Sequence, residues 1–134
     1  MELNELSIKR LRTCENALYM LALEAAKNSP YEFIVTCGHR SVEDQQKLYA
    51  KGRTEPGKKV TNCDGVIYKS KHNYKPSKAF DIAVKINGKI SWAVKYYKIV
   101  GAHFKAVADV LGIDISWGGD WTKFPDFPHI QLKD

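Results

Sequence analysis

Residues 80–92 of the 134-residue chain read FDIAVKINGKISW, in which two strand-like runs flank the dipeptide Asn87-Gly88. Asn-Gly accepts the positive φ angles that both central positions of a tight two-residue turn require, so it is typical of a β-hairpin. We therefore predict antiparallel strands at Phe80–Ile86 and Lys89–Trp92. Upstream, YEFIVT at residues 31–36 is short, aromatic and β-branched, which indicates a buried strand.

Helical patterns surround these strands along the chain. Apolar residues recur at three- and four-residue steps from Leu6 to Ala25, which predicts one amphipathic helix of about five turns. Ser41 opens a second helix, VEDQQKLYAKG, and Tyr96–Leu111 has helical spacing before a glycine. The sequence HIQL at residues 129–132 predicts a last strand. Because no strand–helix–strand repeat is present, we expect an α+β fold, a small antiparallel sheet packed with helices.

Length and composition predict a single domain over residues 1–134, with 44% hydrophobic and 27% charged residues. No apolar run approaches the roughly 18 residues of a membrane helix, and the N-terminus lacks a secretory signal, so we expect synthesis in the cytoplasm. The net charge of +6 favours polyanions such as nucleic acid, anionic lipid or cell-wall polymer. Cys14, Cys37 and Cys63 form no CxxC pair and are expected to be reduced thiols without a catalytic role.

Two of the four histidines stand in unusual positions. His72 lies nine residues before Asp81, on the approach to the first hairpin strand, and His129 opens the last predicted strand. Two imidazoles and one carboxylate on different strands can converge on a divalent cation and leave a fourth tetrahedral position for water, as in a catalytic zinc site. The spacing alone leaves an alternative open, because isolated histidines are more often exposed or hydrogen-bonded structural groups.

Three segments together resemble one known family. Residues 70–82, SKHNYKPSKAFDI, resemble the SxHxxGxAxD signature of the VanY-like zinc D-Ala-D-Ala carboxypeptidase and L-alanyl-D-glutamate endopeptidase family. The segments GHRSVEDQQKLYAKGRT at 38–54 and FPDFPHIQL at 124–132 resemble its other two motifs, in the same order. One departure stands out: the spacing from His72 to Asp81 is two residues longer than in the family pattern, around Lys75 and Pro76. The fold implied by the resemblance is the Hedgehog/DD-peptidase-like one.

Carried across position by position, the resemblance implies a complete hydrolytic site. It implies a Zn²⁺ ion that polarises the amide carbonyl, a general base that moves a proton from water to the leaving amine, and an arginine that stabilises negative charge or binds a carboxylate. It also implies polar residues that bind substrate or support the metal. The implied zinc ligands are His72, Asp81 and His129, the general base is Asp126, and the substrate-binding residues are Arg40, Gln45 and Ser70.

The resemblance implies a phage-type endolysin that cuts the L-alanyl-D-glutamate bond of the peptidoglycan stem peptide. A D-alanyl-D-alanine carboxypeptidase or dipeptidase of the same family is the alternative, and a non-catalytic basic cell-wall-binding module is the alternative from another class. We expect a monomer without a separate cell-wall-binding domain, without nucleic acid as partner and without stable membrane insertion. Without an export signal, such an enzyme would reach the wall in the periplasm only after the membrane is permeabilised.

Overall fold

The computed structural model describes residues 1–133, which form four α-helices, two short 3-10 helices and five strands. The 3-10 helix η1 carries one of the predicted zinc ligands and is followed directly by the long strand β2. The elements in chain order are α1 (Glu5–Leu11), α2 (Asn16–Lys27), β1 (Glu32–Cys37), α3 (Val42–Ala50), η1 (Lys71–Asn73), β2 (Ala79–Ile86), β3 (Lys89–Ser91), α4 (Val94–Leu111), β4 (Ile115–Trp117), η2 (Gly118–Asp120) and β5 (His129–Leu132).

The five strands form one antiparallel sheet with the order β1-β2-β5-β4, and β3 pairs with β2 outside this path. This arrangement confirms the predicted α+β fold. The hairpin turn lies where the sequence predicts it, with φ of 52° at Asn87 and 79° at Gly88. Strand β2 lies at the centre: residues 81–85 pair with β1, residues 79–81 pair with β5 and residues 84–86 pair with β3.

The N-terminal segment differs from the prediction of one helix over Leu6–Ala25. It forms two helices, because the chain leaves α1 after Leu11 and makes a short bridge to the segment before β2. Ser77 N donates to Thr13 O at 2.9 Å, and Glu15 N donates to Ser77 O at 2.9 Å. The apolar spacing continues through this break because Cys14 is buried as it would be in a helix, so the periodicity alone does not show it.

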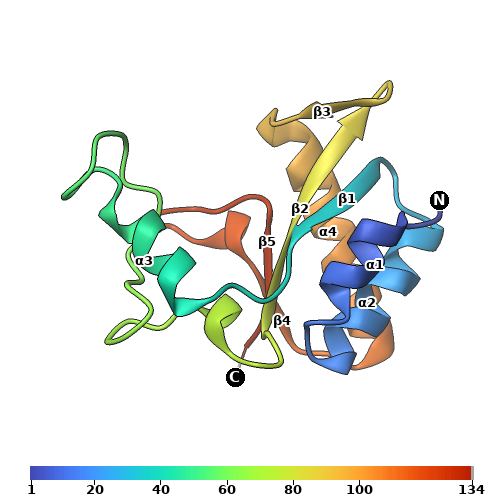
Figure 1. The fold of residues 1–134 in the computed structure, drawn as a ribbon. Coiled ribbons are helices and arrows are strands. Elements are labelled where there is room, and N and C mark those ends of the chain that lie inside the picture. Colours follow the sequence, from blue (N-terminus) through green and yellow to red (C-terminus); the bar gives the residue numbers. More distant parts are fainter. Residues whose placement is uncertain (134) are drawn as a thin grey trace.

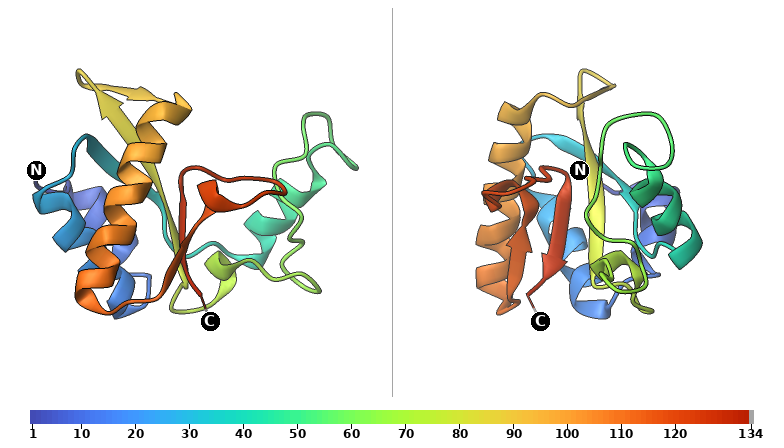
Figure 2. Two further views of the ribbon diagram at one scale, coloured as in Figure 1. Left: turned by 180° about the vertical axis from the view of Figure 1, so that it is seen from behind. Right: turned by 90° about the vertical axis from the view of Figure 1, so that its left-hand side faces the viewer.

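The helices divide into two groups around the sheet (Figure 1). Helices α1, α2 and α4 lie on one side, and α3 with the long loop at residues 51–70 lies on the other. The view from behind shows the same separation (Figure 2, left). The hydrophobic core lies between the sheet and the first group, where Phe104 of α4 packs edge-on against Phe33 of β1 and Phe80 of β2. Within residues 1–133, no helix has both the length and the apolar character needed to cross a membrane.

Close packing of α4 on β4 depends on Gly101. This residue is buried, and a Cβ atom there would overlap the Trp117 indole ring. The Trp117 Nε1 in turn donates to Phe127 O at 2.8 Å, which attaches the loop before β5 to the body of the protein. Packing in the core thus fixes the path of the loop that leads into β5, and β5 begins with the predicted zinc ligand His129.

Candidate metal centre

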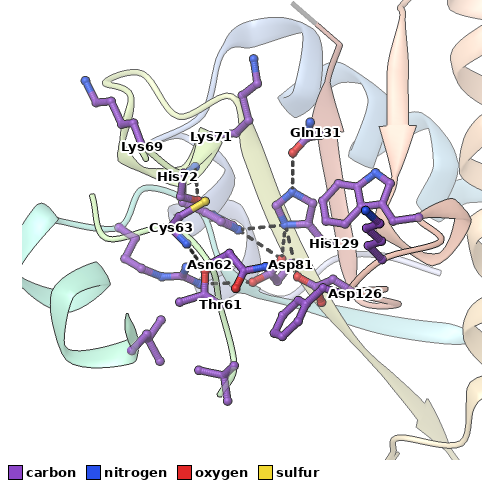
Figure 3. A pocket seen from close by; sticks show the side chains of 17 residues that line it. Thr61, Asn62, Cys63, Lys69, Lys71, His72, Asp81, Asp126, His129 and Gln131 are labelled. Carbon is purple, nitrogen blue, oxygen red and sulfur yellow. Dashed lines mark hydrogen bonds and ion pairs between the residues drawn. The ribbon is translucent and has the colours of Figure 1, made fainter. Parts of the chain in front are cut away.

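The three predicted zinc ligands meet at one point (Figure 3). His72 comes from η1, Asp81 from β2 and His129 from the first position of β5. The His72 Nε2 lies 3.2 Å from Asp81 Oδ1 and 3.2 Å from His129 Nδ1, and His129 Nδ1 lies 3.0 Å from Asp81 Oδ1. Asp81 and His129 are direct partners in the β2–β5 register. Residues that are far apart in the sequence therefore present three donor atoms to one another.

The other ring nitrogens of both histidines have hydrogen-bond partners that fix their tautomers. His72 Nδ1 lies 2.7 Å from the carbonyl oxygen of Gly38, and His129 Nε2 lies 2.9 Å from Gln131 Oε1. A carbonyl oxygen accepts only, so the neutral His72 ring carries its proton on Nδ1 and its lone pair on Nε2. With Gln131 accepting through Oε1, His129 correspondingly directs the Nδ1 lone pair toward Asp81. Such outer contacts are typical of metal-binding histidines.

This donor set fits a divalent cation. Two ring lone pairs and a carboxylate oxygen that meet at one point repel one another unless a positive charge, a proton or a metal ion, lies among them. Tetrahedral zinc with bonds of about 2.0–2.1 Å requires donors about 3.3 Å apart, and the observed separations are 3.0–3.2 Å. His72 and His129 are almost fully buried, and Asp81 is 18% exposed. The residues present therefore fit the zinc ion that the sequence predicts.

The electrostatics of the site also favour a cation. Burial alone lowers the pKa of His72, but the adjacent Asp81 carboxylate outweighs burial and raises that pKa to about 10. Burial raises the pKa of Asp81, but the two imidazoles outweigh it and hold that pKa far below the usual range. Both shifts have one physical origin, the attraction between the Asp81 carboxylate and the positive charge that the imidazoles carry beside it, and a bound cation would supply the same attraction.

The loop that carries His72 is held by hydrogen bonds at both ends of η1. Ser70 is buried; its Oγ accepts from His72 N at 3.2 Å, and its own N donates to Asn73 Oδ1 at 2.9 Å. Asn73 Nδ2 donates to Arg40 O at 3.0 Å, and Arg40 N donates to His72 O at 2.8 Å. Ser70 therefore supports the predicted ligand directly and also lines the cavity described below. The longer spacing before Asp81 is accommodated without separating the ligands.

Asp126 lies beside the three donors, on the loop before β5. Its Oδ2 is 3.8 Å from His129 Nδ1, and its side chain is 42% exposed. The backbone is fixed because Asp126 N donates to Gly118 O at 2.9 Å and His129 N donates to Asp126 O at 3.1 Å. Partial burial raises the pKa of Asp126, and the negative charge of Asp81 raises it further. A carboxyl group with a raised pKa next to a cation site suits proton transfer near neutral pH.

Arg40 faces Asp81 from the side opposite to the two histidines. Its Nη2 is 3.4 Å from Asp81 Oδ2, the oxygen that does not face the histidines, and its Nη1 donates to Gln45 Oε1 at 2.9 Å. Gln45 is fully buried, and its Nε2 donates to Cys63 O at 2.8 Å and to Thr61 Oγ1 at 3.3 Å. The carboxamide of Gln45 thus has its hydrogen bonds with protein groups behind Arg40. This placement does not favour a direct contact between Gln45 and substrate.

A cavity of about 550 Å³ opens onto this centre. His72, Asp81, Asp126, His129 and Arg40 line it on one side, and residues from the loop at 60–71 and from the segment at 121–124 form its walls. Its volume falls in the range typical of small-molecule and peptide-side-chain sites. The predicted catalytic and metal residues therefore share one accessible space, with Gln45 outside its lining.

Sequence reasoning missed two features of the site. Cys37 ends β1 with its Sγ 3.9 Å from His72 Nδ1 and 3.7 Å from Arg40 Nη2, although its spacing gave no sign of this. Cys14, Cys37 and Cys63 are all free thiols, as predicted. Phe124 lines the cavity with φ of 52°, an unusual backbone conformation for an aromatic residue, and is 40% exposed. The only signal in the sequence for Phe124 as a site residue was its position two residues before Asp126.

Comparison with known proteins identifies relatives over the whole chain. A family model described as phage L-alanyl-D-glutamate peptidase matches residues 1–133. The peptidoglycan L-alanyl-D-glutamate endopeptidase CwlK of Bacillus subtilis is 37% identical over 114 residues, which cover 81% of this chain and 65% of that protein. The L-alanyl-D-glutamate peptidase of Escherichia phage T5 is 31% identical over 131 residues, 95% of this chain and 85% of the phage protein.

A solved structure agrees with these relatives. The crystal structure of the Serratia marcescens L-Ala D-Glu endopeptidase ChiX superimposes with a TM-score of 0.81 and 26% sequence identity, covering 99% of this chain and 90% of that one. The family match extends across all three sequence motifs and across every residue that meets at the metal centre. The chain belongs to the phage L-alanyl-D-glutamate peptidase family.

Proposed function

We propose that the protein is a zinc-dependent peptidoglycan endopeptidase that hydrolyses the L-alanyl-D-glutamate bond of the stem peptide. The observation that carries this proposal is the meeting of His72 Nε2, Asp81 Oδ1 and His129 Nδ1 within 3.2 Å of one another at an open cavity. The relatives named for this bond come from a bacterium and from a phage, which supports the same substrate here.

His72, Asp81 and His129 would hold the zinc ion. When bound, zinc supplies Lewis acidity, which polarises an amide carbonyl and makes water more acidic. Two neutral imidazoles and one carboxylate leave the ion with a net positive charge, which favours this chemistry. Gly38 and Gln131 hold both rings in the orientation that ligation requires, so metal binding would need no movement of the rings.

Asp126 is positioned to move the proton. Its carboxylate lies next to the three donor atoms, and its backbone is fixed by bonds to Gly118 and His129. We assign it as the general base that takes a proton from the attacking water and passes it to the leaving nitrogen. The raised pKa of Asp126 makes its carboxylate a stronger base, which favours uptake of the proton from water.

Arg40 supplies fixed positive charge on the other side of the cavity. The Arg40 side chain is 18% exposed, and Asp81 and Gln45 hold its guanidinium in place beside the site. A guanidinium in this position stabilises the negative charge that develops on the carbonyl oxygen, or binds a substrate carboxylate through paired hydrogen bonds. Ser70 supports the ligand loop, and Gln45 positions Arg40.

In its biological setting, we propose a phage-type lysis enzyme that works as a monomer on the cell wall. A permeabilised membrane would give such an enzyme access to its substrate from the cytoplasm. Its net charge of +6 would favour the approach to an anionic wall.

Mass spectrometry of fragments released from purified peptidoglycan tests this function. We expect fragments with a new N-terminal D-glutamate, produced only by zinc-loaded enzyme. Released free D-alanine would instead establish the carboxypeptidase alternative. Wall binding without any released fragment, together with retained zinc, would establish the non-catalytic module. An enzyme whose His129 is replaced by alanine is the control, because it lacks one ligand and should release nothing.

A further inference from the structure

Three lysines surround a single tyrosine ring next to the metal centre. The Nζ atoms of Lys69, Lys78 and Lys71 lie 4.5, 5.0 and 5.9 Å from the centroid of the Tyr74 ring. All three distances are within the reach of cation–π attraction. We call these four residues the lysine cluster.

The fold brings the members of the lysine cluster together from two segments. Lys69 and Lys71 flank Ser70, the N-cap residue of η1, whereas Lys78 lies directly before β2. Lys78 N donates to Lys71 O at 3.0 Å, which joins the two segments. The Tyr74 carbonyl oxygen lies 3.0 Å from His39 Nδ1, so the backbone under the ring is also held. The lysine cluster is therefore built by the same short loop that positions the first zinc ligand.

The cluster concentrates positive charge that the surrounding protein does not neutralise. Among residues 1–133, the ion pairs of the structure involve neither Lys69, Lys71 nor Lys78. The face of the tyrosine ring offsets only part of the repulsion among three ammonium groups. Tyr74 is 36% exposed and Lys69 is exposed, so a ligand can reach the cluster. Such a site attracts an anion.

The cluster is continuous with the cavity of the metal centre. Lys69 and Lys71 line that cavity together with His72 and Asp81. Figure 3 shows both lysines beside His72, on the other side of the centre from Asp126. An extended peptide held at the three ligands would therefore pass over the lysine cluster at one end of the cavity.

We propose that the lysine cluster binds carboxylates of the stem peptide on the D-glutamate side of the cleaved bond. This inference rests on the proposed function. In that substrate the free carboxylates belong to the part that leaves with the new amine, whereas the part before the bond leads to the neutral lactyl link of the glycan. The cluster would thus set the direction of the peptide, with its acidic half over Tyr74 and its glycan half toward Trp121 and Phe124.

Binding of two uncleavable peptides to the zinc-loaded enzyme tests the proposal. Both carry an N-methylated L-alanyl-D-glutamate bond, and they differ only in that one has free carboxylates and the other has amidated ones. Calorimetry should show that the wild type binds the free acid about tenfold more tightly, since each exposed ion pair contributes a factor of about two to five. The double variant Lys69→Met/Lys71→Met should lose most of this preference. Lys89→Met, an exposed lysine on the hairpin strand β3, should keep it.

Equal affinity of the wild type for the two peptides would overturn the proposal. A double variant whose affinity falls equally for both peptides would also overturn it, because the lysines would then stabilise the loop and not bind carboxylates. A glycerol-phosphate polymer that displaces the free-acid peptide from the wild type at equal charge would also overturn it and identify a phosphate-binding patch. Because the peptides are not cut, a failure of the proposed hydrolysis appears separately, as absent D-glutamate fragments with the peptide preference intact.

Discussion

Replacing Gln45 with leucine should weaken both the fold and the active site, because this one side chain joins two parts of the cavity wall. Its Oε1 accepts from Arg40 Nη1 at 2.9 Å, and its Nε2 donates to Cys63 O at 2.8 Å. Leucine has a similar volume and forms neither bond. The substitution would leave the guanidinium short of one partner and release the loop around Cys63 from α3.

The magnitude follows from the bonds that are lost. A buried hydrogen bond to a charged group contributes about 1.5–3 kcal/mol and one between neutral groups about 1 kcal/mol. Since Gln45 is fully buried, we expect Gln45→Leu to lower the free energy of unfolding by about 3 kcal/mol. For a chain of 134 residues, this corresponds to a fall in Tm of roughly 10 °C. Loss of the fixed Arg40 position should lower kcat by about 100-fold.

Thermal unfolding and hydrolysis of a defined stem peptide measure the two effects separately. Gln45→Glu keeps an acceptor for Arg40 but removes the donor to Cys63, so it should lose stability while retaining much more of kcat than Gln45→Leu. Gln46→Leu is the matched control, because Gln46 lies on the same helix but is exposed, and its Tm should change by less than about 2 °C. If Gln45→Leu behaved like this control in both assays, the positioning role of Gln45 would be refuted.

Three further results are expected. Asp126→Asn should lower the rate of hydrolysis by about 10²–10⁴-fold, while the zinc content, measured by atomic absorption, stays at that of the wild type. Loss of zinc from this variant would mean that Asp126 is a ligand instead of the base. Removal of zinc with a chelator should abolish hydrolysis and lower Tm, and adding zinc back should restore both. The reason is that a metal at a thousandfold excess over its Kd stabilises the folded state by about 4 kcal/mol. An unchanged Tm would contradict a metal at this centre. Gly101→Ala should lower the free energy of unfolding by about 1–3 kcal/mol because its methyl group would overlap Trp117, and chemical denaturation that shows a gain in stability would contradict this packing.

Local patterns in the sequence were sufficient to predict most secondary structure. The Asn87-Gly88 turn, the Ser41 cap and the Gly112 helix end each depend on residues within a few positions, and the structure has all three where they were predicted. The proposed zinc ligands were identified only through the resemblance, because the spacing between His72 and His129 carries no geometric information by itself. The structure brings their donor atoms together by pairing β2 with β5.

Features that depend on long-range contacts were not predictable. The break after Leu11 arises from backbone bonds to Ser77, a segment far along the chain. Cys37 seemed an ordinary packed thiol until the fold placed it near the His72 ring. Gln45 was expected to contact substrate, yet burial and three protein partners place it behind Arg40. In each case the decisive neighbour is a residue that no local pattern identifies.

The opposition of Asp81 and His129 across two antiparallel strands makes metal occupancy a gauge of correct strand alignment. Side chains alternate between the two faces of a sheet, so a slip of β5 by a single position would turn the imidazole toward the core and bring Ile130 opposite the carboxylate. A misaligned chain could keep almost all its backbone bonds and still be unable to hold the ion. Zinc stoichiometry at the proposed site would therefore count the molecules whose central strands are in register, which spectroscopy of secondary structure would not distinguish.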